Sequence, residues 1–270
     1  MNRQALKRVI PRPLWRFGSD NYWWWRNRGR HAWARLTSPT WRANLRRLEG
    51  LRDTHQGKRC FIIGNGPSLK QMDLSLLRDE YTFGLNRIYL LFPELGFQTT
   101  YLVSVNELVL EQCAQEMREL SVPKLITWRA RKWLGDDPHT LFIDSDFTAA
   151  EQFSTDLTGR IYEGFTVTFV ALQAAYFMGF QEAILIGVDH NFITQGTPNE
   201  TVVSTGDDPN HFAPGYFGKG FRWQLPDLEG SERAYTLARQ AYQRAGRQIL
   251  DATLGGKLTI FPKVNYSDLF

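Results

Sequence analysis

Cysteine is scarce in this sequence of 270 residues, and long apolar runs are missing from it. The two cysteines, Cys60 and Cys113, each adjoin an apolar or helical run, which argues against a disulfide scaffold or a cysteine-based zinc site and fits a reducing compartment. No stretch approaches the roughly 20 apolar residues that a membrane-spanning helix needs. The N-terminus also lacks the apolar core and cleavage site of a signal peptide. We therefore expect a cytoplasmic protein.

Acidic residues are nearly missing from the first 59 residues, which hold 15 of the 32 Lys and Arg but only 3 of the 28 Asp and Glu. The net charge of +4 is therefore the sum of a basic segment and an acidic remainder. The basic segment also carries six of the nine Trp. We expect residues 1–56 to form a basic, Trp-rich helical arm and residues 57–270 to form one domain. Because that domain is acidic, we expect no nucleic-acid partner.

Two helices are predicted in the arm, over residues 21–36 and over residues 38–51, with Ser38 as the N-cap of the second. Tryptophan and arginine are interleaved in the first of them. That pattern suits a helix in the interface of an anionic membrane, such as the inner membrane face. It equally suits tryptophans that pack on the domain under arginine side chains. Both alternatives stay open.

Short apolar runs alternate with helical patterns after residue 57. Strands are predicted over residues 59–63, 81–85, 100–105, 124–128, 140–143, 183–188 and 257–261. Helices are predicted over residues 69–77, 107–120, 168–178 and 231–250. This alternation predicts an α/β domain of three layers, Rossmann-like, with a mainly parallel sheet.

A glycine-rich segment separates the first predicted strand from the helix after it. It comprises Gly64, Asn65, Gly66, Pro67 and Ser68. Glycines let a backbone approach a ligand closely, and Ser68 with the free N–H groups of a helix start can hold a phosphate. The segment fits neither the Walker A pattern nor the dinucleotide fingerprint, and an ordinary turn has a similar composition. We interpret it as a nucleotide-binding segment.

Two further asparagines, Asn86 and Asn106, stand directly after the second and third predicted strands. In an open parallel sheet, ligands bind at the carboxyl ends of the strands, so these side chains and Asn65 are expected to converge. Neutral amides can both donate and accept, which suits a base and a ribose. Asparagine is also common in turns, which is the alternative for each residue singly.

These residues, with the string GNGPSLKQMD and the block over residues 166–189, resemble the MptE-like family (6-hydroxymethylpterin diphosphokinase MptE-like) and the related bacterial sialyltransferases of glycosyltransferase family 42. The resemblance covers residues 58–270. It implies a GT-A-like fold, a nucleotide-sugar donor and a reaction that requires no cofactor. In the sialyltransferases three asparagines contact the cytidine nucleotide of a CMP-sugar. The resemblance implies the same role for Asn65, Asn86 and Asn106.

A second part of the resemblance concerns residues 164–168, which correspond to the Arg-Ile-Thr-Ser-Gly segment of the sialyltransferases but lack its arginine. Thr166 and Thr168 in this segment are nucleotide-binding candidates. The catalytic stretch His-Tyr-x-Gly-His of that family corresponds to residues 211–216 here. His211 matches the first histidine, and the catalytic second histidine has no match.

His211 is the best candidate for a catalytic base, because an imidazole with an ordinary pKa of about 6.5 can take a proton near neutral pH. It lies in residues 206–223, whose Gly, Pro and aromatic content is typical of a mobile lid. Tyr216, Lys219 and Arg222 in the same segment are candidates for donating to a leaving phosphate. An aromatic cluster that packs a long loop is the alternative, and His190 is a weaker candidate for the base.

Two acidic motifs complete the candidates. Asp189 follows the strand over residues 183–188 and is a catalytic candidate that can bind a ribose, orient a histidine, ligate Mg²⁺ or cap a turn. Residues 144–146, Asp-Ser-Asp, have the form of the DxD motif that holds a metal-bound nucleotide diphosphate, but we favour a turn there. We assign no residue as a metal ligand.

We predict a transferase, namely a sialyltransferase-like glycosyltransferase. Its donor would be a nucleotide-activated, CMP-linked acidic sugar, and its acceptor a glycan or a lipid-linked molecule in surface polysaccharide or glycoconjugate synthesis. An alternative is an MptE-like diphosphotransferase that needs Mg²⁺ and carboxylates such as Asp189. A third is a non-catalytic nucleotide-binding protein. A homo-oligomer is compatible with each of them.

Overall fold

The computed structural model describes residues 37–147, 152–193, 196–206 and 208–270. The predicted arm helix over residues 21–36, with the interleaved Trp and Arg, lies outside the described residues. The chain divides into two compact units, Met1–Arg47 and Leu48–Phe270. Helix α3 (Pro39–Glu49) begins after Ser38, whose hydroxyl accepts a hydrogen bond of 3.2 Å from the Trp41 N–H. The predicted N-cap is thus confirmed.

A parallel sheet of eight strands forms the centre of the larger unit, in the order β10-β7-β1-β2-β3-β4-β5-β6. The strands are β1 (Arg59–Ile63), β2 (Thr82–Leu85), β3 (Tyr101–Ser104), β4 (Lys124–Thr127), β5 (Thr140–Asp146), β6 (Arg160–Tyr162), β7 (Glu182–Ile186) and β10 (Gln248–Asp251). Most of their residues are buried on both sides of the pleat, as a sheet covered on both faces requires. The predicted α/β class is confirmed.

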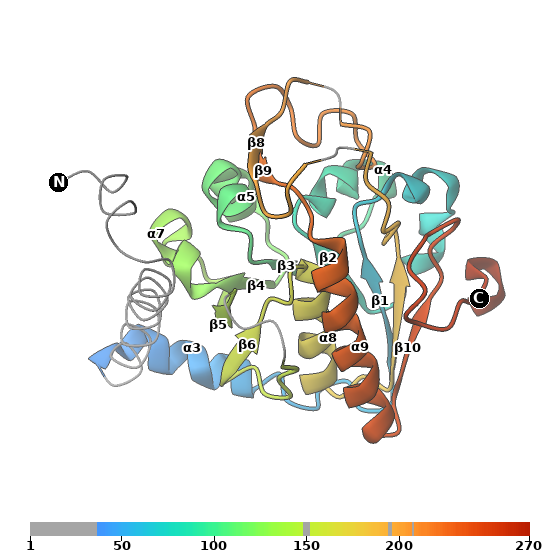
Figure 1. Ribbon diagram of the computed structural model, residues 1–270. Helices are drawn as coiled ribbons and strands as arrows, with labels where there is room; N and C mark the ends of the chain where they lie inside the picture. The colour runs from blue at the N-terminus through green and yellow to red at the C-terminus, as the bar shows by residue number, and fades with distance from the viewer. Residues whose placement is uncertain (1–36, 148–151, 194–195, 207) are drawn as a thin grey trace, which may run out of the picture. The chain divides into compact units, whose positions relative to one another are not determined.

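Helices cover both faces of this sheet (Figure 1). They are α4 (Phe92–Leu95), α5 (Glu107–Gln112), α6 (Ala114–Glu119), α7 (Arg131–Leu134), α8 (Val167–Phe177) and α9 (Leu228–Arg244), with the 3₁₀ helices η1 (Pro67–Gln71), η2 (Leu74–Leu77), η3 (Ile88–Leu91), η4 (Trp128–Ala130) and η5 (Tyr266–Leu269). Helix α8 packs against β1, β2, β3, β6 and α9. The chain runs along the sheet in one direction from β1 to β6 and in the opposite direction from β6 to β7, through α8. Because crossovers are right-handed, α8 lies on the opposite face of the sheet from the helices that join β1 to β4.

The strand order reverses between β1 and β7. The chain moves outward from β1 to β6 and returns through α8 to add β7 on the other side of β1. Such a switch point leaves a crevice at the carboxyl ends of the two strands, where ligands bind in open α/β sheets. The antiparallel pair β8 (Thr201–Val203) and β9 (Arg222–Gln224), which was not predicted, lies above these ends in Figure 1.

Four predicted elements differ from the structure, and one of them, the helix expected over residues 107–120, is divided at Cys113 into α5 and α6. The helix expected over residues 69–77 is two 3₁₀ helices, because Met72 is extended and the Asp73 carboxylate caps η2 by accepting from the Ser75 N–H at 3.1 Å. The helix expected to reach residue 250 ends at Arg244, shortly before Gly246 in the left-handed region. The strand expected over residues 257–261 is wrong, since the strand beside β7 is β10.

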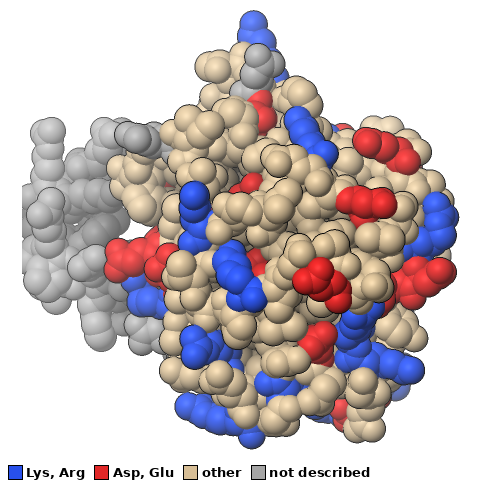
Figure 2. Space-filling model, turned by 90° about the vertical axis from the view of Figure 1, so that its right-hand side faces the viewer, with Lys and Arg blue, Asp and Glu red and all other residues tan. Residues whose placement is uncertain are grey.

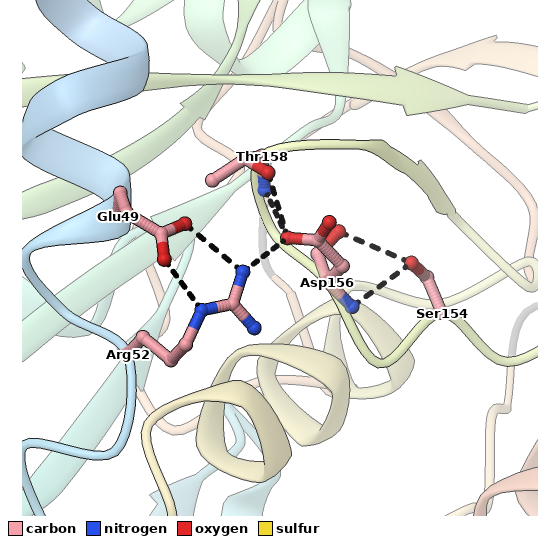
Figure 3. A network of polar contacts seen from close by, with 5 residues as sticks. All are labelled: Glu49, Arg52, Ser154, Asp156 and Thr158. Atoms are coloured by element: carbon pink, nitrogen blue, oxygen red, sulfur yellow. Dashed lines mark hydrogen bonds and ion pairs between the residues drawn. The ribbon is translucent and has the colours of Figure 1, made fainter.

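The residues just before β1 pack on the end of α8. The backbone N–H groups of Asp53 and His55 donate to the carbonyls of Phe177 and Met178 at the end of α8, at 3.1 and 2.8 Å. Figure 3 shows Arg52 between the carboxylates of Glu49 and Asp156, and the distance to Asp156 is 3.2 Å. Asp156 lies in the loop before β6. These contacts lie within the larger unit, which begins at Leu48.

Candidate functional site

A cavity of about 780 Å³ opens at the switch point. It is lined by nine of the twelve predicted site residues: Gly64, Asn65, Gly66, Asn86, Asn106, Thr166, Thr168, Asp189 and His211. Pro67, Ser68 and Tyr216 do not line it. These nine residues come from six separate stretches of the chain, and the three strand-end asparagines are among them, as the strand-end argument predicted. Their roles toward a ligand remain predictions.

The three asparagines differ in what their side chains already do. The Oδ1 atom of Asn65 is buried and finds no hydrogen-bond partner among the described residues. The Oδ1 of Asn86 accepts from the Ser104 hydroxyl at 2.9 Å, and that of Asn106 caps α5 by accepting from the N–H of Leu108 at 2.9 Å. Asn86 and Asn106 therefore offer their NH₂ groups as donors to a ligand, whereas Asn65 offers a buried acceptor, which is costly to leave unpaired.

Asn106→Ser separates the capping role of Asn106 from ligand binding. Serine caps helices about as well as asparagine, so we expect stability within about 0.5 kcal/mol of the wild type. The lost NH₂ donor should weaken nucleotide binding about 3- to 10-fold, because a hydrogen bond to an uncharged base or ribose contributes about 0.5–1.5 kcal/mol. Calorimetric titration with nucleotide and thermal melting measure the two effects. Asn265→Ser, at the start of η5 and outside the cavity, is the matched control; equal nucleotide affinity of both variants would contradict the role.

Gly64 and Gly66 are required by contacts within the protein. A Cβ at Gly64 would lie 2.2 Å from the carbonyl oxygen of Gly187, and one at Gly66 would lie 1.8 Å from Oδ2 of Asp189. Both glycines therefore let the loop after β1 pack on the loop after β7. Close approach of a ligand was the predicted reason for them, and the structure adds this second one.

The predicted phosphate site at Ser68 is already filled by a side chain. The Ser68 N–H and hydroxyl donate to the two carboxylate oxygens of Asp189, at 3.1 and 2.7 Å. Burial raises the pKa of Asp189, while both hydrogen bonds from Ser68 oppose the rise. A phosphate bound there would meet the charge of Asp189, and η1 has only five residues. The structure therefore favours Asp189 as the cap of this turn.

The N-terminus of α8 is a better place for a phosphate. Thr166 caps this helix of 11 residues, accepting from the Thr168 N–H at 3.3 Å, and the first turn has no acidic residue. The two preceding residues, Gly164 and Phe165, both have positive φ, at 54° and 63°. A positive φ is strained for phenylalanine, and such strain is frequent at ligand sites. The positive end of the helix dipole thus lies at the cavity, at the two predicted threonines.

His211 lies on the cavity wall with a carboxylate behind it. Its Nδ1 is 2.7 Å from Oδ2 of Asp208, a side chain that is 4% exposed. The opposite ring nitrogen, Nε2, is left for a ligand. Tyr216 does not reach the cavity: it is fully buried and stacks on the His211 ring, with centroids 4.1 Å apart and planes at 5°. The expected donation from Tyr216 to a leaving phosphate therefore does not fit, and burial raises the pKa of its hydroxyl well above the usual value.

The cationic side chains expected at the phosphate lie elsewhere. Neither Lys219 nor Arg222 lines the cavity, and Arg222 pairs with Glu111 at 2.7 Å on the surface. Among the described lining residues, Arg129 is the only Lys or Arg. Its guanidinium donates to Glu107 and Glu163, each at 2.6 Å, so its charge is already balanced. On the face drawn in Figure 2, basic and acidic side chains are likewise interspersed.

The carboxylates proposed for Mg²⁺ are also engaged. Residues 144–146 belong to β5, so they are not the turn that we favoured. Asp144 and Asp146 both pair with Arg160, at 3.7 and 3.4 Å, and Asp189 is bonded to Ser68. Over the described ranges no group of three His, Cys, Asp or Glu side chains is placed to hold a metal ion. The donor set of these residues, as arranged, does not fit Mg²⁺.

His190 lines the cavity but is tied to helix α9. Its Nε2 lies 2.9 Å from Oε1 of Glu232, and its backbone is in the left-handed region, with φ of 52°. It remains a weaker candidate for the base than His211, because the carboxylate of Glu232 is half exposed and holds the ring less firmly than the buried Asp208.

Two residues of the site were not predicted from the sequence. Asp208 stands three positions before His211, a spacing that a search for acids near candidate histidines would have found. Arg87 follows Asn86 directly and contacts Tyr216, 129 positions away, for which the sequence carries no signal.

The fold is an α/β fold of the Rossmann type, with a cavity at the switch point of its sheet. The chain belongs to the MptE-like family, 6-hydroxymethylpterin diphosphokinase MptE-like, which matches residues 40–195. No curated protein matches it. The chain is similar in structure to the MAf glycosyltransferase from Magnetospirillum magneticum AMB-1, with a TM-score of 0.50 and 16% identity over 84% of this chain and 39% of that one. It thus spans about two fifths of that protein.

A second solved structure is a mammalian sialyltransferase in complex with Gal-beta-1-3GalNAc-ortho-nitrophenol. Its TM-score is 0.39 and its identity 13%, over 88% of this chain and 86% of that one. In the part of the chain that the structure describes, no helix is long and apolar enough to cross a membrane.

Proposed function

We propose that the protein is a glycosyltransferase that moves a sugar from a nucleotide-activated donor to an acceptor hydroxyl. The observation that carries this proposal is the pair of His211 and Asp208 at 2.7 Å, on the wall of a cavity that three strand-end asparagines also line. A histidine with a buried carboxylate on one nitrogen is suited to take a proton on the other.

In the proposed reaction, Nε2 of His211 removes the proton of the acceptor hydroxyl while its oxygen forms a bond to the anomeric carbon of the sugar. The bond from that carbon to the phosphate oxygen breaks, and its electron pair leaves with the nucleotide. Asp208 stabilises the imidazolium that forms, and the N-terminus of α8 at Thr166 faces the charge of the leaving phosphate. No metal ion is needed for these steps.

The donor proposed is a CMP-linked acidic sugar, on the basis of the resemblance at Asn65, Asn86 and Asn106. The positive charge of Arg129 in the cavity is already balanced by Glu107 and Glu163. A monophosphate leaving group, which carries less negative charge than a diphosphate, therefore suits this cavity better. The acceptor proposed is a glycan or a lipid-linked molecule in surface polysaccharide or glycoconjugate synthesis. Cytoplasmic location, contact of residues 1–56 with a membrane and homo-oligomerisation remain predictions.

Diphosphotransfer is the second candidate, and the description of the family favours it. That reaction is expected to use Mg²⁺ held by carboxylates. The carboxylates of Asp144, Asp146 and Asp189 are each engaged within the protein, which is why we place glycosyl transfer first.

A thermal-shift screen with CMP, CDP, UDP, GDP and ATP, each with and without Mg²⁺, tests the proposal. We expect stabilisation by CMP without a metal ion, because a ligand that binds only the folded state raises the melting temperature. Stabilisation by ATP only with Mg²⁺, and none by CMP, would instead support diphosphotransfer. CMP binding without any turnover of CMP-sugars would favour the non-catalytic alternative.

A further inference from the structure

Arg87 is a buried arginine that none of the steps above uses. It is 8% exposed and lies next to Asn86, at the carboxyl end of β2. An ionised side chain inside a protein is costly unless each donor finds a partner. The partners of Arg87 therefore show what the arginine is there to hold.

Three of the contacts of Arg87 converge on Tyr216. Its backbone N–H donates to the Tyr216 hydroxyl at 3.3 Å, and Nη1 donates to the Tyr216 carbonyl. The guanidinium carbon lies 5.7 Å from the centre of the Tyr216 ring and 5.5 Å from that of Phe221. Tyr216 is thus bonded at both its backbone and its hydroxyl by one residue.

The remaining donors of Arg87 are also used. Nε donates to the Tyr89 hydroxyl at 3.3 Å, and Nη2 donates to Glu116 at 3.1 Å. The Tyr89 hydroxyl donates in turn to the same glutamate at 2.5 Å. Glu116 and Tyr89 thus fix the plane of the guanidinium, so that its direction toward Tyr216 is set.

Tyr216 passes this constraint to His211, because its ring is stacked on the imidazole. The edge of the imidazole is fixed by Asp208, and its face is fixed by Tyr216. Phe217 also meets this ring edge-on, with centroids 4.9 Å apart, but the contacts that fix its orientation most directly are those with Asp208 and Tyr216. The two together direct Nε2 toward the cavity.

We infer that Arg87 is a positioning residue, which acts through Tyr216 to fix the ring of His211. This inference rests on the proposed function in taking His211 as the base. Arg87 directly follows Asn86, and the Phe212 N–H, next to His211, donates to the Asn65 carbonyl at 2.9 Å. The segment expected to be a lid is thus tied to the loops after β1 and β2.

The test compares Arg87→Met with Arg247→Met. Arg247 is a matched control, because it donates to the carbonyl of Tyr176 at 2.6 Å and lies over that ring at 4.4 Å, outside the cavity lining. In protein labelled with ¹⁵N-histidine, NMR reports which ring nitrogen carries the proton, and His211→Gln assigns the signal among the five histidines. The wild type and Arg247→Met should show His211 protonated on Nδ1, with Nε2 free.

In Arg87→Met the His211 ring can tilt out of line with the Asp208 carboxylate, which weakens the hydrogen bond that keeps the proton on Nδ1. The His211 signals should therefore shift toward an average of the two tautomers, and kcat for sugar transfer should fall about 10- to 100-fold, with the KM for the donor within about 2-fold. Arg87→Lys should restore the charge but not the tautomer, because it lacks the fork that bonds Tyr216. A folded Arg87→Met with the wild-type tautomer signals would overturn the inference.

If Arg87→Met does not fold, Tyr216→Leu decides, because it removes the stacked ring and keeps Arg87. Unchanged His211 signals in that variant would likewise overturn the inference. The NMR measurement needs no substrate. A protein that binds no CMP but loses the tautomer in Arg87→Met would therefore refute the proposed function and leave the positioning role intact.

Discussion

Asp208→Asn is expected to lower the turnover of sugar transfer by about a hundred- to ten-thousand-fold, the range in which acid–base groups contribute. An asparagine in place of Asp208 cannot stabilise the imidazolium, and its amide NH₂ can face Nδ1 and favour the wrong tautomer of His211. His211→Gln should have an effect of the same size. Neither variant should change nucleotide affinity more than about 3-fold, because both residues act on the acceptor side.

Steady-state kinetics with a CMP-sugar measures the turnover, and calorimetric titration with CMP measures the nucleotide affinity. Asp156→Asn is the control, because this aspartate bonds Thr158 and Arg52 at the surface, outside the cavity lining. The double variant with His211→Gln should be no slower than either single variant, since the two residues act as one unit. Wild-type turnover in Asp208→Asn would remove His211 from the role of the base.

The central strands were predictable because each is buried on both faces and so reads as a short apolar run. Residues 59–63 were predicted and observed within the same bounds. β6 (Arg160–Tyr162) was not predicted, because it has three residues with one buried side chain and so does not form an apolar run in the sequence. β10 (Gln248–Asp251) was not predicted, because its sequence continues the helical pattern of α9 and only the turn at Gly246 separates the two elements.

The place of the site was also predictable, because topology alone brings Asn65, Asn86 and Asn106 to one edge of the sheet. The contacts within the site were not. Ser68 and Asp189 are 121 positions apart, and nothing in the glycine-rich segment shows that a carboxylate from the loop after β7 caps the start of η1. Long-range pairing of this kind depends on the strand order, which the sequence does not state.

Gly64→Ala should be among the most destabilising single changes in the molecule. The added Cβ would lie 2.2 Å from the carbonyl oxygen and 2.7 Å from the carbonyl carbon of Gly187, both backbone atoms that cannot rotate away. Gly187 cannot easily retreat, because its carbonyl accepts from the Gly66 N–H at 2.9 Å and a Cβ on Gly187 itself would meet Leu69 at 2.6 Å. We expect a loss of roughly 2–4 kcal/mol in the free energy of unfolding.

Chemical denaturation measures this loss, and Gly159→Ala is the matched control, because its Cβ would meet nothing closer than 3.5 Å and its φ is not in the left-handed region. Gly64→Ala should also weaken CMP binding, because a shift between the loops after β1 and β7 moves Asn65 away from Asn86 and Asn106. If Gly64→Ala unfolds with the free energy of Gly159→Ala, these loops do not pack as tightly as the contacts at Gly64 and Gly66 indicate. If it is destabilised but binds CMP as the wild type does, the nucleotide does not depend on Asn65.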